Sequence, residues 1–149
     1  MASEAITRGS CLCGKIQYEI TGKLENNNMC WCISCRKVTG SVAMANTWSL
    51  TRAARQNFKL LQGEDSLKIY FDRSCDSGGC IERGFCTSCG STMISENREK
   101  FPGAYIVPVG SMDIDPSTSD WAPKAEYYAK RKVPWLKTPD DTTKYTELV

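Results

Sequence analysis

The chain has 149 residues, of which 41% are hydrophobic and 24% are charged, as is typical of a soluble globular protein. Its formal net charge of +2 is too small to indicate a nucleic-acid partner. No apolar run approaches the roughly 18 residues that cross a membrane, and the start of the chain lacks the apolar stretch of a signal peptide. We therefore expect a cytoplasmic protein without a membrane partner. It should fold as a single domain over residues 1–149, with a core at about 7–135 and a C-terminal tail at 136–149.

Alternation of apolar and polar residues predicts a mainly β fold. In chain order, the expected strands are Lys15–Thr21, Ser41–Trp48, Ser66–Phe71, Ile81–Phe85 and Ala104–Val109. In the first of these, Ile16, Tyr18 and Ile20 alternate with polar residues, which indicates a strand with one buried face. Helical signals are few. One short helix is expected at Leu50–Gln56 and one helical turn at Ala125–Arg131.

The cysteines carry the clearest chemical signal. Seven of the nine form three tight clusters, namely Cys11 and Cys13, then Cys30, Cys32 and Cys35, then Cys86 and Cys89. Thiolates so close in sequence can converge on one tetrahedral zinc ion. A disulfide scaffold is the alternative, but the odd number of cysteines, the absent secretory signal and the chain length weigh against it. Because a structural zinc takes four ligands, we expect about two zinc ions per chain, one in a closed site and one in an open three-ligand site.

The two-cysteine clusters have the features of a closed site. Cys11–Cys13 and Cys86–Cys89 are each followed by a glycine, which suits a tight turn. Four thiolates leave no open coordination position, so such a site would be structural and would contribute to folding. The spacing alone also permits another pairing, in which Cys11–Cys13 shares a zinc ion with Cys32 and Cys35.

The three-cysteine cluster has the features of an open site. Cys30, Cys32 and Cys35 lie so close together that one coordination position would remain for water, hydroxide or a substrate thiol. Cys75 and Cys80 are either candidates for a fourth ligand or ordinary small core or loop residues. The chain contains no histidine, so a proton carrier near neutral pH would have to be another group.

The order of these motifs resembles the glutathione-dependent formaldehyde-activating enzyme family, a cysteine pattern that centromere protein V-like proteins share. The matching segments are Gly9–Gly14, Cys30–Lys37, Thr39–Ser41, Phe85–Ser91, Val109–Asp113, Trp121–Pro123, Arg131 and Pro134–Trp135. Two positions depart from the family pattern. The family commonly has histidine where this chain has Trp31, and it often has histidine directly after the glutamate that corresponds to Glu126.

The resemblance implies a small zinc-stabilised β-tent fold and carbon–sulfur lyase chemistry. The typical reaction joins glutathione and formaldehyde into S-hydroxymethylglutathione, or reverses this step. By similarity, the structural zinc ligands are Cys11, Cys13, Cys86 and Cys89, and the catalytic zinc ligands are Cys30, Cys32 and Cys35. We therefore expect a zinc-dependent lyase that acts on glutathione or a glutathione adduct.

Four further residues are candidates for the site. Glu126 lies in the family's C-terminal motif and is the first candidate for a proton carrier, with Tyr127 beside it. The alternative for Glu126 is an exposed surface glutamate. Arg36 and Lys37 directly follow the open cluster and could hold a carboxylate of glutathione. Packing or a surface ion pair is the alternative for each.

Two other functions remain open. The first is a glutathione-independent zinc lyase of specialised metabolism that acts on an aromatic or cyclic small molecule. Its pocket could be lined by Trp31, Trp48, Tyr127 and Trp135. The second is a non-catalytic zinc module that binds a protein or chromatin. The basic segment Lys124–Lys137 could steer an anionic ligand, although a solvated basic face is the simpler interpretation.

Overall fold

The computed structural model describes residues 4–48, 57–115, 117–118 and 121–148. The helix expected at Leu50–Gln56 lies outside this part of the chain. None of the described helices is both long enough and apolar enough to cross a membrane.

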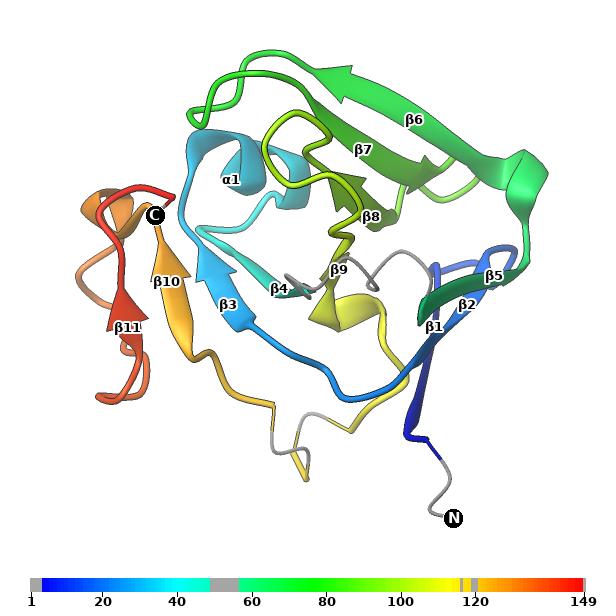
Figure 1. Ribbon diagram of the computed structural model, residues 1–149, viewed down its shortest axis with the longest axis horizontal. Coiled ribbons are helices and arrows are strands. Elements are labelled where there is room, and N and C mark those ends of the chain that lie inside the picture. Colours follow the sequence, from blue (N-terminus) through cyan, green and yellow to red (C-terminus); the bar gives the residue numbers. More distant parts are fainter. Residues whose placement is uncertain (1–3, 49–56, 116, 119–120, 149) are drawn as a thin grey trace.

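Strands dominate the described residues and form two sheets (Figure 1). The strands are β1 (Ile6–Ser10), β2 (Gln17–Thr21), β3 (Asn27–Cys30), β4 (Met44–Trp48), β5 (Phe58–Gln62), β6 (Leu67–Asp72), β7 (Ile81–Cys86), β8 (Thr92–Glu96), β9 (Ile106–Pro108), β10 (Ala125–Tyr127) and β11 (Thr143–Lys144). The smaller sheet has the order β1-β2-β5, and the larger has the order β11-β10-β3-β4-β9-β8-β7-β6. In Figure 1 the larger sheet runs from β11 at the left to β6 at the top.

The expected mainly β fold with few short helices is confirmed. The five expected strands correspond to β2, β4, β6, β7 and β9, mostly with shorter bounds. The helical elements within the described residues are α1 (Ile33–Thr39) and the 3₁₀ turns η1 (Glu64–Ser66), η2 (Val109–Ser111) and η3 (Ala129–Arg131). The helical turn expected at Ala125–Arg131 is therefore wrong over Ala125–Tyr127, which forms strand β10 between β3 and β11.

Helix α1 was not predicted, because it is short and three of its seven residues, Ile33, Val38 and Thr39, are β-branched and disfavour a helix. Its two caps explain why it forms. The sulfur of Cys32 accepts a hydrogen bond from the backbone N–H of Cys35 at 3.3 Å. At the other end Gly40 has a φ of 67°, a left-handed conformation that glycine adopts without strain. A cysteine that acts as a candidate ligand thus also begins the helix.

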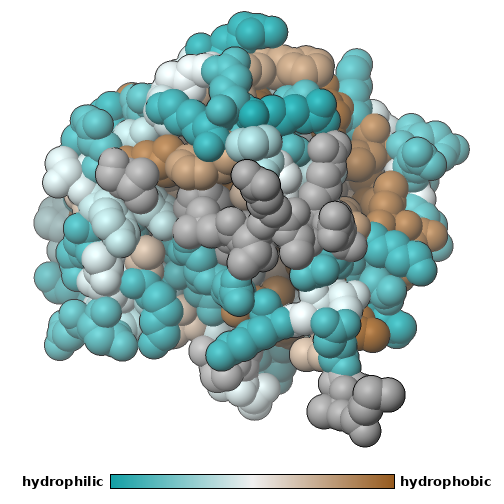
Figure 2. Space-filling view, in the orientation of Figure 1, coloured by the Kyte–Doolittle hydropathy of each residue, from teal (hydrophilic) through white to brown (hydrophobic). Residues whose placement is uncertain are grey.

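The buried apolar residues form two core clusters, and each contains one cysteine cluster. Cys11 and Cys86 pack with Ile16, Tyr18 and Met93 beside the smaller sheet. The second core cluster, built on the β3, β4 and β10 region, contains Cys32 and Cys35 with other residues that include Trp31, Met44, Tyr127 and Tyr128. The two groups of thiols therefore occupy separate parts of the fold. Hydrophilic residues cover much of the face shown in Figure 2, with hydrophobic residues exposed in smaller areas between them.

Candidate metal centres

The first thiol cluster joins the start of the chain to its middle. Cys11 and Cys13 follow β1, Cys86 ends β7, and Cys89 lies in the turn before β8. Their four sulfur atoms all lie within 4.8 Å of one another. The sulfur of Cys13 is 3.5 Å from that of Cys11 and 3.8 Å from that of Cys86. Four sulfur atoms bound to a tetrahedral zinc ion at about 2.3 Å lie about 3.8 Å apart, so this four-thiol cluster fits zinc.

Two tight turns hold the four-thiol cluster. The backbone N–H of Gly14 donates to the carbonyl of Cys11 at 3.0 Å, and that of Gly90 donates to the carbonyl of Cys86 at 2.8 Å. Both glycines have positive φ, 77° and 75°, as the sequence pattern indicated. The hydroxyl of Ser91 accepts a hydrogen bond from the backbone of the first turn at 3.0 Å and so ties the two turns together. This arrangement excludes the alternative pairing of the first cluster with Cys32 and Cys35.

The three-thiol cluster is built where β3 passes into α1. Cys30 ends β3, Cys32 caps the helix and Cys35 lies within it, and their sulfur atoms are within 4.8 Å of one another. Hydrogen bonds from the Cys30 and Cys35 thiols lower the pKa of Cys32 to about 3. Hydrogen bonds with Cys32 and Cys35 raise the pKa of Cys30 well above its ordinary value. Without metal the cluster therefore keeps one thiolate, the form of cysteine that binds metals. A zinc ion would displace the protons of the other two thiols, and three thiolates would leave one position of the zinc ion open.

A cavity of about 70 Å³ borders the three-thiol cluster. It is several times larger than the roughly 10–15 Å³ that one water molecule requires. All three thiols of the cluster line it, together with polar and aromatic side chains that include Asn46, Arg83, Tyr127 and Tyr128. None of the residues of the four-thiol cluster lines this cavity. A small molecule in the cavity would thus meet the three thiols.

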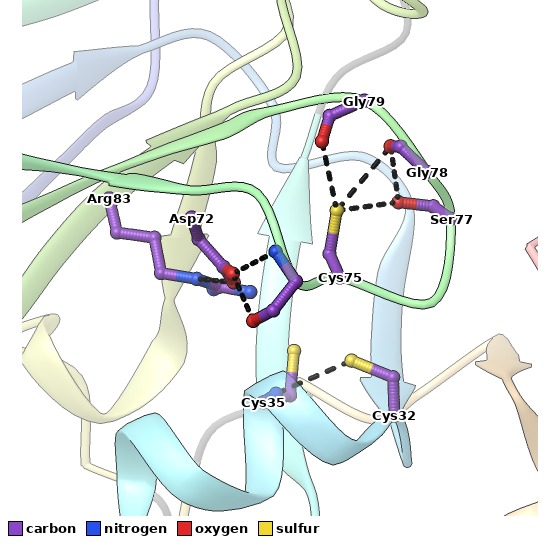
Figure 3. A network of polar contacts seen from close by, with 9 residues as sticks. Cys32, Cys35, Asp72, Cys75, Ser77, Gly78, Gly79 and Arg83 are labelled. Carbon is purple, nitrogen blue, oxygen red and sulfur yellow. Dashed lines mark hydrogen bonds and ion pairs between the residues drawn. The ribbon is translucent and has the colours of Figure 1, made fainter.

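Arg83, one of the residues that line the cavity, forms a buried ion pair with Asp72. The Nε of Arg83 donates to a carboxylate oxygen of Asp72 at 2.9 Å, and the two side chains are only 5% and 6% exposed. The other oxygen of Asp72 accepts hydrogen bonds from the hydroxyl and the backbone N–H of Ser74, at 2.8 and 3.0 Å. Figure 3 shows this pair beside the loop that carries Cys75, near the start of α1 with Cys35. Arg83 lines the cavity, and its Nη2 is buried without a hydrogen-bond partner among the described residues.

Arg83 was missed by the sequence analysis. The only available signal was its place in the expected strand Ile81–Phe85. Side chains alternate between the two faces of a strand, so Arg83 shares a face with the apolar residues Ile81 and Phe85. A charged residue on the inward face of a strand is rarely buried without a partner. That partner, Asp72, comes from β6, and the β6–β7 pairing brings the two together.

The comparisons with known proteins agree with this geometry. The family model described as glutathione-dependent formaldehyde-activating enzyme matches residues 6–131. The chain belongs to this family. A crystal structure of a Rhodobacter sphaeroides protein, a structural genomics target, is similar with a TM-score of 0.53 and 21% identity, covering 74% of this chain and 92% of that one. At this identity the likeness is one of fold. Among curated proteins, none matches the chain significantly.

The two residues expected to carry protons lie on opposite sides of β10. Tyr127 lines the cavity. Glu126, its neighbour in the strand, is fully buried elsewhere and is not among the cavity residues. Its carboxylate accepts hydrogen bonds from the indole N–H of Trp31 at 3.1 Å and from the hydroxyl of Thr138 at 3.1 Å, and it pairs with the ammonium of Lys132 at 2.9 Å. It is therefore neither an exposed glutamate nor a member of the cavity wall.

Trp31 links Glu126 to the three-thiol cluster. It stands between Cys30 and Cys32 and is fully buried, at the position where the family commonly has histidine. Its indole N–H supplies a hydrogen bond to the glutamate, as a histidine N–H also can. The Nζ of Lys132 lies 5.6 Å from the centre of the indole ring, a cation–π distance. Glu126 thus fixes the segment that carries two of the candidate ligands.

We expect Glu126→Gln to lower the free energy of unfolding by about 1–3 kcal/mol, because Lys132 loses its buried charged partner. Burial alone would raise the pKa of Glu126, but hydrogen bonds from Lys132 and Thr138 outweigh it and hold this pKa below the ordinary value of 4.5. The charged form therefore contributes its full stability above 4.5, and the contribution is lost only as the pH falls through the lower folded-state pKa. Urea unfolding at pH 7, 6 and 5 should show a constant difference between the two proteins.

The matched control is Glu147→Gln, which removes an exposed carboxylate that pairs with Lys130. This change should cost less than about 1 kcal/mol. Equal stability of Glu126→Gln and the unchanged protein at pH 7 would show that the buried contacts of Glu126 contribute nothing. A difference that shrinks between pH 7 and 5 would show that the folded-state pKa is raised.

Arg36 and Lys37 lie away from the cavity. Both side chains are exposed, they occupy the last turn of α1, and neither lines the cavity. Cations near the end of a helix interact favourably with its backbone carbonyls. The described contacts therefore do not bring these two residues to the three-thiol cluster.

Cys75 and Cys80 belong to neither thiol cluster. Both are free cysteines, so they form no disulfide. Cys75 is buried and lines the cavity, but its sulfur donates to the carbonyl of Gly78 at 3.4 Å and accepts from the hydroxyl of Ser77 at 3.5 Å. Figure 3 shows its sulfur turned toward its own loop. Among the described residues, two groups of cysteines could hold a metal ion, and neither group includes Cys75 or Cys80.

The aromatic residues of the cavity differ from those expected. Tyr127 lines it, as do Tyr128 and Phe101. Trp31 does not line it, and Trp135 is 68% exposed. The side chain of Trp48 lies outside the described part of the chain.

Proposed function

We propose that this protein is a zinc-dependent carbon–sulfur lyase that acts on glutathione or a glutathione adduct. The observation that carries the proposal is the different setting of the two thiol clusters. Four thiols close one cluster, whereas the other has three thiols and borders a cavity. Membership of the glutathione-dependent formaldehyde-activating enzyme family supports a thiol as the substrate group that enters this cavity.

Two zinc ions would have different tasks. Cys11, Cys13, Cys86 and Cys89 would hold the structural ion, and Cys30, Cys32 and Cys35 the catalytic one. When bound at the open site, zinc supplies Lewis acidity, which lowers the pKa of a thiol or polarises a carbonyl. The three thiolates already donate much negative charge, so the site favours a soft sulfur ligand over hydroxide. The walls of the cavity restrict the water around the reacting atoms.

We propose a positioning role for Glu126 and a proton path through water. Glu126 accepts a hydrogen bond from Trp31 and also contacts Lys132, Lys144 and Thr138. It does not line the cavity. Tyr127 lines the cavity and is the candidate to orient that water, although its hydroxyl also accepts a hydrogen bond from the Asn26 amide at 3.2 Å and donates one to it at 3.4 Å. Burial raises the pKa of Tyr128 to about 12, which makes this hydroxyl a poor acid at neutral pH.

Only the thiol end of glutathione fits the cavity, together with the formaldehyde carbon that the thiol attacks. The rest of the tripeptide would lie outside. Arg36 and Lys37 are exposed and not among the cavity residues, so we propose that they attract the carboxylates of glutathione from solution rather than hold them at the reacting atoms.

The test is the exchange between formaldehyde and S-hydroxymethylglutathione. With ¹³C-labelled formaldehyde and glutathione, NMR exchange spectroscopy measures how fast the label moves between the free aldehyde and the adduct. We expect the zinc-loaded protein to accelerate this exchange and the rate to saturate with glutathione. A zinc-loaded protein that leaves the exchange at its uncatalysed rate would contradict the proposal.

The tyrosine and phenylalanine side chains of the cavity favour one second candidate. Tyr127, Tyr128 and Phe101 could hold an aromatic or cyclic substrate of a zinc lyase that does not use glutathione. Calorimetric titration separates the two functions, because glutathione would bind saturably only in the first. Zinc-loaded protein that binds neither glutathione nor small aromatic carbonyl compounds would favour a non-catalytic zinc module.

A further inference from the structure

We propose that Arg83 is a catalytic residue of the three-thiol site. Its Nη2 donates a hydrogen bond to the oxygen atom of the carbon whose bond to sulfur forms or breaks. The inference rests on the proposed lyase function and names the group of this chain that stabilises the charge developing during the reaction.

Arg83 has a hydrogen-bond donor that nothing among the described residues uses. The residue is 4% exposed and lines the cavity, yet its Nη2 has no hydrogen-bond partner within the described residues. A buried donor left unpaired costs about 1–3 kcal/mol, and more when it is charged. An oxygen atom of a ligand that reaches this donor from the cavity would satisfy it.

The guanidinium of Arg83 is held in place by Asp72. Asp72 accepts a hydrogen bond from its Nε at 2.9 Å, and Ser74 in turn donates two hydrogen bonds to Asp72. An arginine side chain stays protonated in proteins, so the guanidinium is charged, and its hydrogen bond to Asp72 sets its orientation before substrate binds. Such preorganised donors are the most effective stabilisers of developing charge.

The charges around Arg83 decide which oxygen it binds. Arg83 and Asp72 together carry no net charge, and three thiolates bound to one zinc ion would carry a net charge of −1. A carboxylate would add a full negative charge to these surroundings. An oxygen that is neutral in the substrate and gains charge only in the transition state fits better. The carbonyl oxygen of an aldehyde, which becomes the hydroxyl oxygen of the adduct, has this property.

Formation of the carbon–sulfur bond needs only the thiol, the aldehyde and water as a proton carrier. In the direction of synthesis, the thiol proton passes to water, and the sulfur electron pair forms a bond to the carbonyl carbon. The π-electron pair of the carbonyl moves to its oxygen, which accepts the hydrogen bond from Nη2, and water then supplies the proton of the new hydroxyl. In cleavage the hydroxyl proton passes to water, the carbonyl re-forms and the sulfur leaves as a thiolate. Arginine keeps its protons throughout, so it stabilises charge and transfers no proton.

A purely structural role for Arg83, as the counter-ion of Asp72, makes a different prediction. If that were its only role, removing the charges of both Arg83 and Asp72 would restore the exchange activity that Arg83→Gln loses. The test therefore uses Arg83→Gln and the double variant Asp72→Asn/Arg83→Gln, which leaves no unpaired buried carboxylate. Arg98→Gln is the matched control, because the side chain of Arg98 is 57% exposed and does not line the cavity.

The experiment measures the ¹³C-formaldehyde and glutathione exchange with each zinc-loaded protein, together with zinc content and thermal unfolding. We expect Arg83→Gln and the double variant to lower kcat about 100-fold, as the loss of one oxyanion donor does. The KM for glutathione should change much less, and zinc content should match that of the unchanged protein. Arg98→Gln should behave as the unchanged protein does.

Three results would overturn the inference in distinguishable ways. Full activity of Arg83→Gln, or recovery of full activity in the double variant, would show that Arg83 does not contact the reacting oxygen. The lyase proposal would survive either result. Lack of exchange by the unchanged zinc-loaded protein would overturn the lyase proposal and this role with it. Should Arg83→Gln fail to fold, the double variant carries the test.

Discussion

Cys86→Ser is expected to unfold the protein. Cys86 is fully buried at the end of β7 and belongs to the four-thiol cluster that joins the start of the chain to its middle. Structural zinc contributes about 10–16 kcal/mol to the folding of small domains, which matches or exceeds the roughly 5–15 kcal/mol of net stability of a typical domain. A serine hydroxyl is not ionised at neutral pH and is a poor replacement for a thiolate ligand. The loss of this one ligand should therefore remove most of the folding free energy.

Circular dichroism and urea unfolding test this expectation, with zinc content measured on the same samples. The matched control is Cys80→Ser, which changes a partly buried cysteine outside both thiol clusters and should leave the fold and the zinc content intact. A cooperative unfolding transition for Cys86→Ser at the same urea concentration as for the unchanged protein would contradict a structural role for the four-thiol cluster.

Cys32→Ser should have the opposite pattern, a stable protein without exchange activity. Serine is a favoured helix cap, so its hydroxyl can accept the hydrogen bond from the backbone N–H of Cys35 that Cys32 accepts now. We therefore expect a change in stability of only about 1 kcal/mol. The three-thiol cluster, however, loses the thiolate whose pKa lies at about 3. Formaldehyde–glutathione exchange should fall to the uncatalysed rate.

The control for this prediction is Cys75→Ser, because Cys75 lines the same cavity but bonds within its own loop. It should keep its zinc and most of its exchange activity. If Cys32→Ser instead unfolds as Cys86→Ser does, the three-thiol cluster is structural. If it keeps the full exchange rate, the reaction takes place elsewhere.

The three cysteine clusters could be predicted because ligand spacing and turn glycines are local properties of the sequence, whereas spacing left the pairing of the clusters open and the family resemblance supplied it. Cys86 and Cys89, with Gly90 after them, already define the turn that the structure shows. Strands β2 and β6 were predictable for the same reason, since alternation over five or six residues indicates one buried face. These features do not depend on which distant segment packs against them.

The rest of the site depends on contacts between distant segments. Strand β10 has three residues, too few for a pattern, and it exists because β3 and β11 pair with it. Without this strand, nothing in the sequence shows that Tyr127 and Glu126 point to opposite sides. Likewise, the sequence places Trp31 between two candidate ligands, but only the structure shows that its indole N–H donates a hydrogen bond to Glu126.

Zinc per chain is the most direct test of the division between a closed and an open cluster. Elemental mass spectrometry would be applied to the unchanged protein and to Cys32→Ser, both purified without added metal or chelator. We predict about two zinc ions in the first and about one in the second. A value near one for the unchanged protein would mean that the three-thiol cluster does not hold zinc, and it would contradict the account of the site.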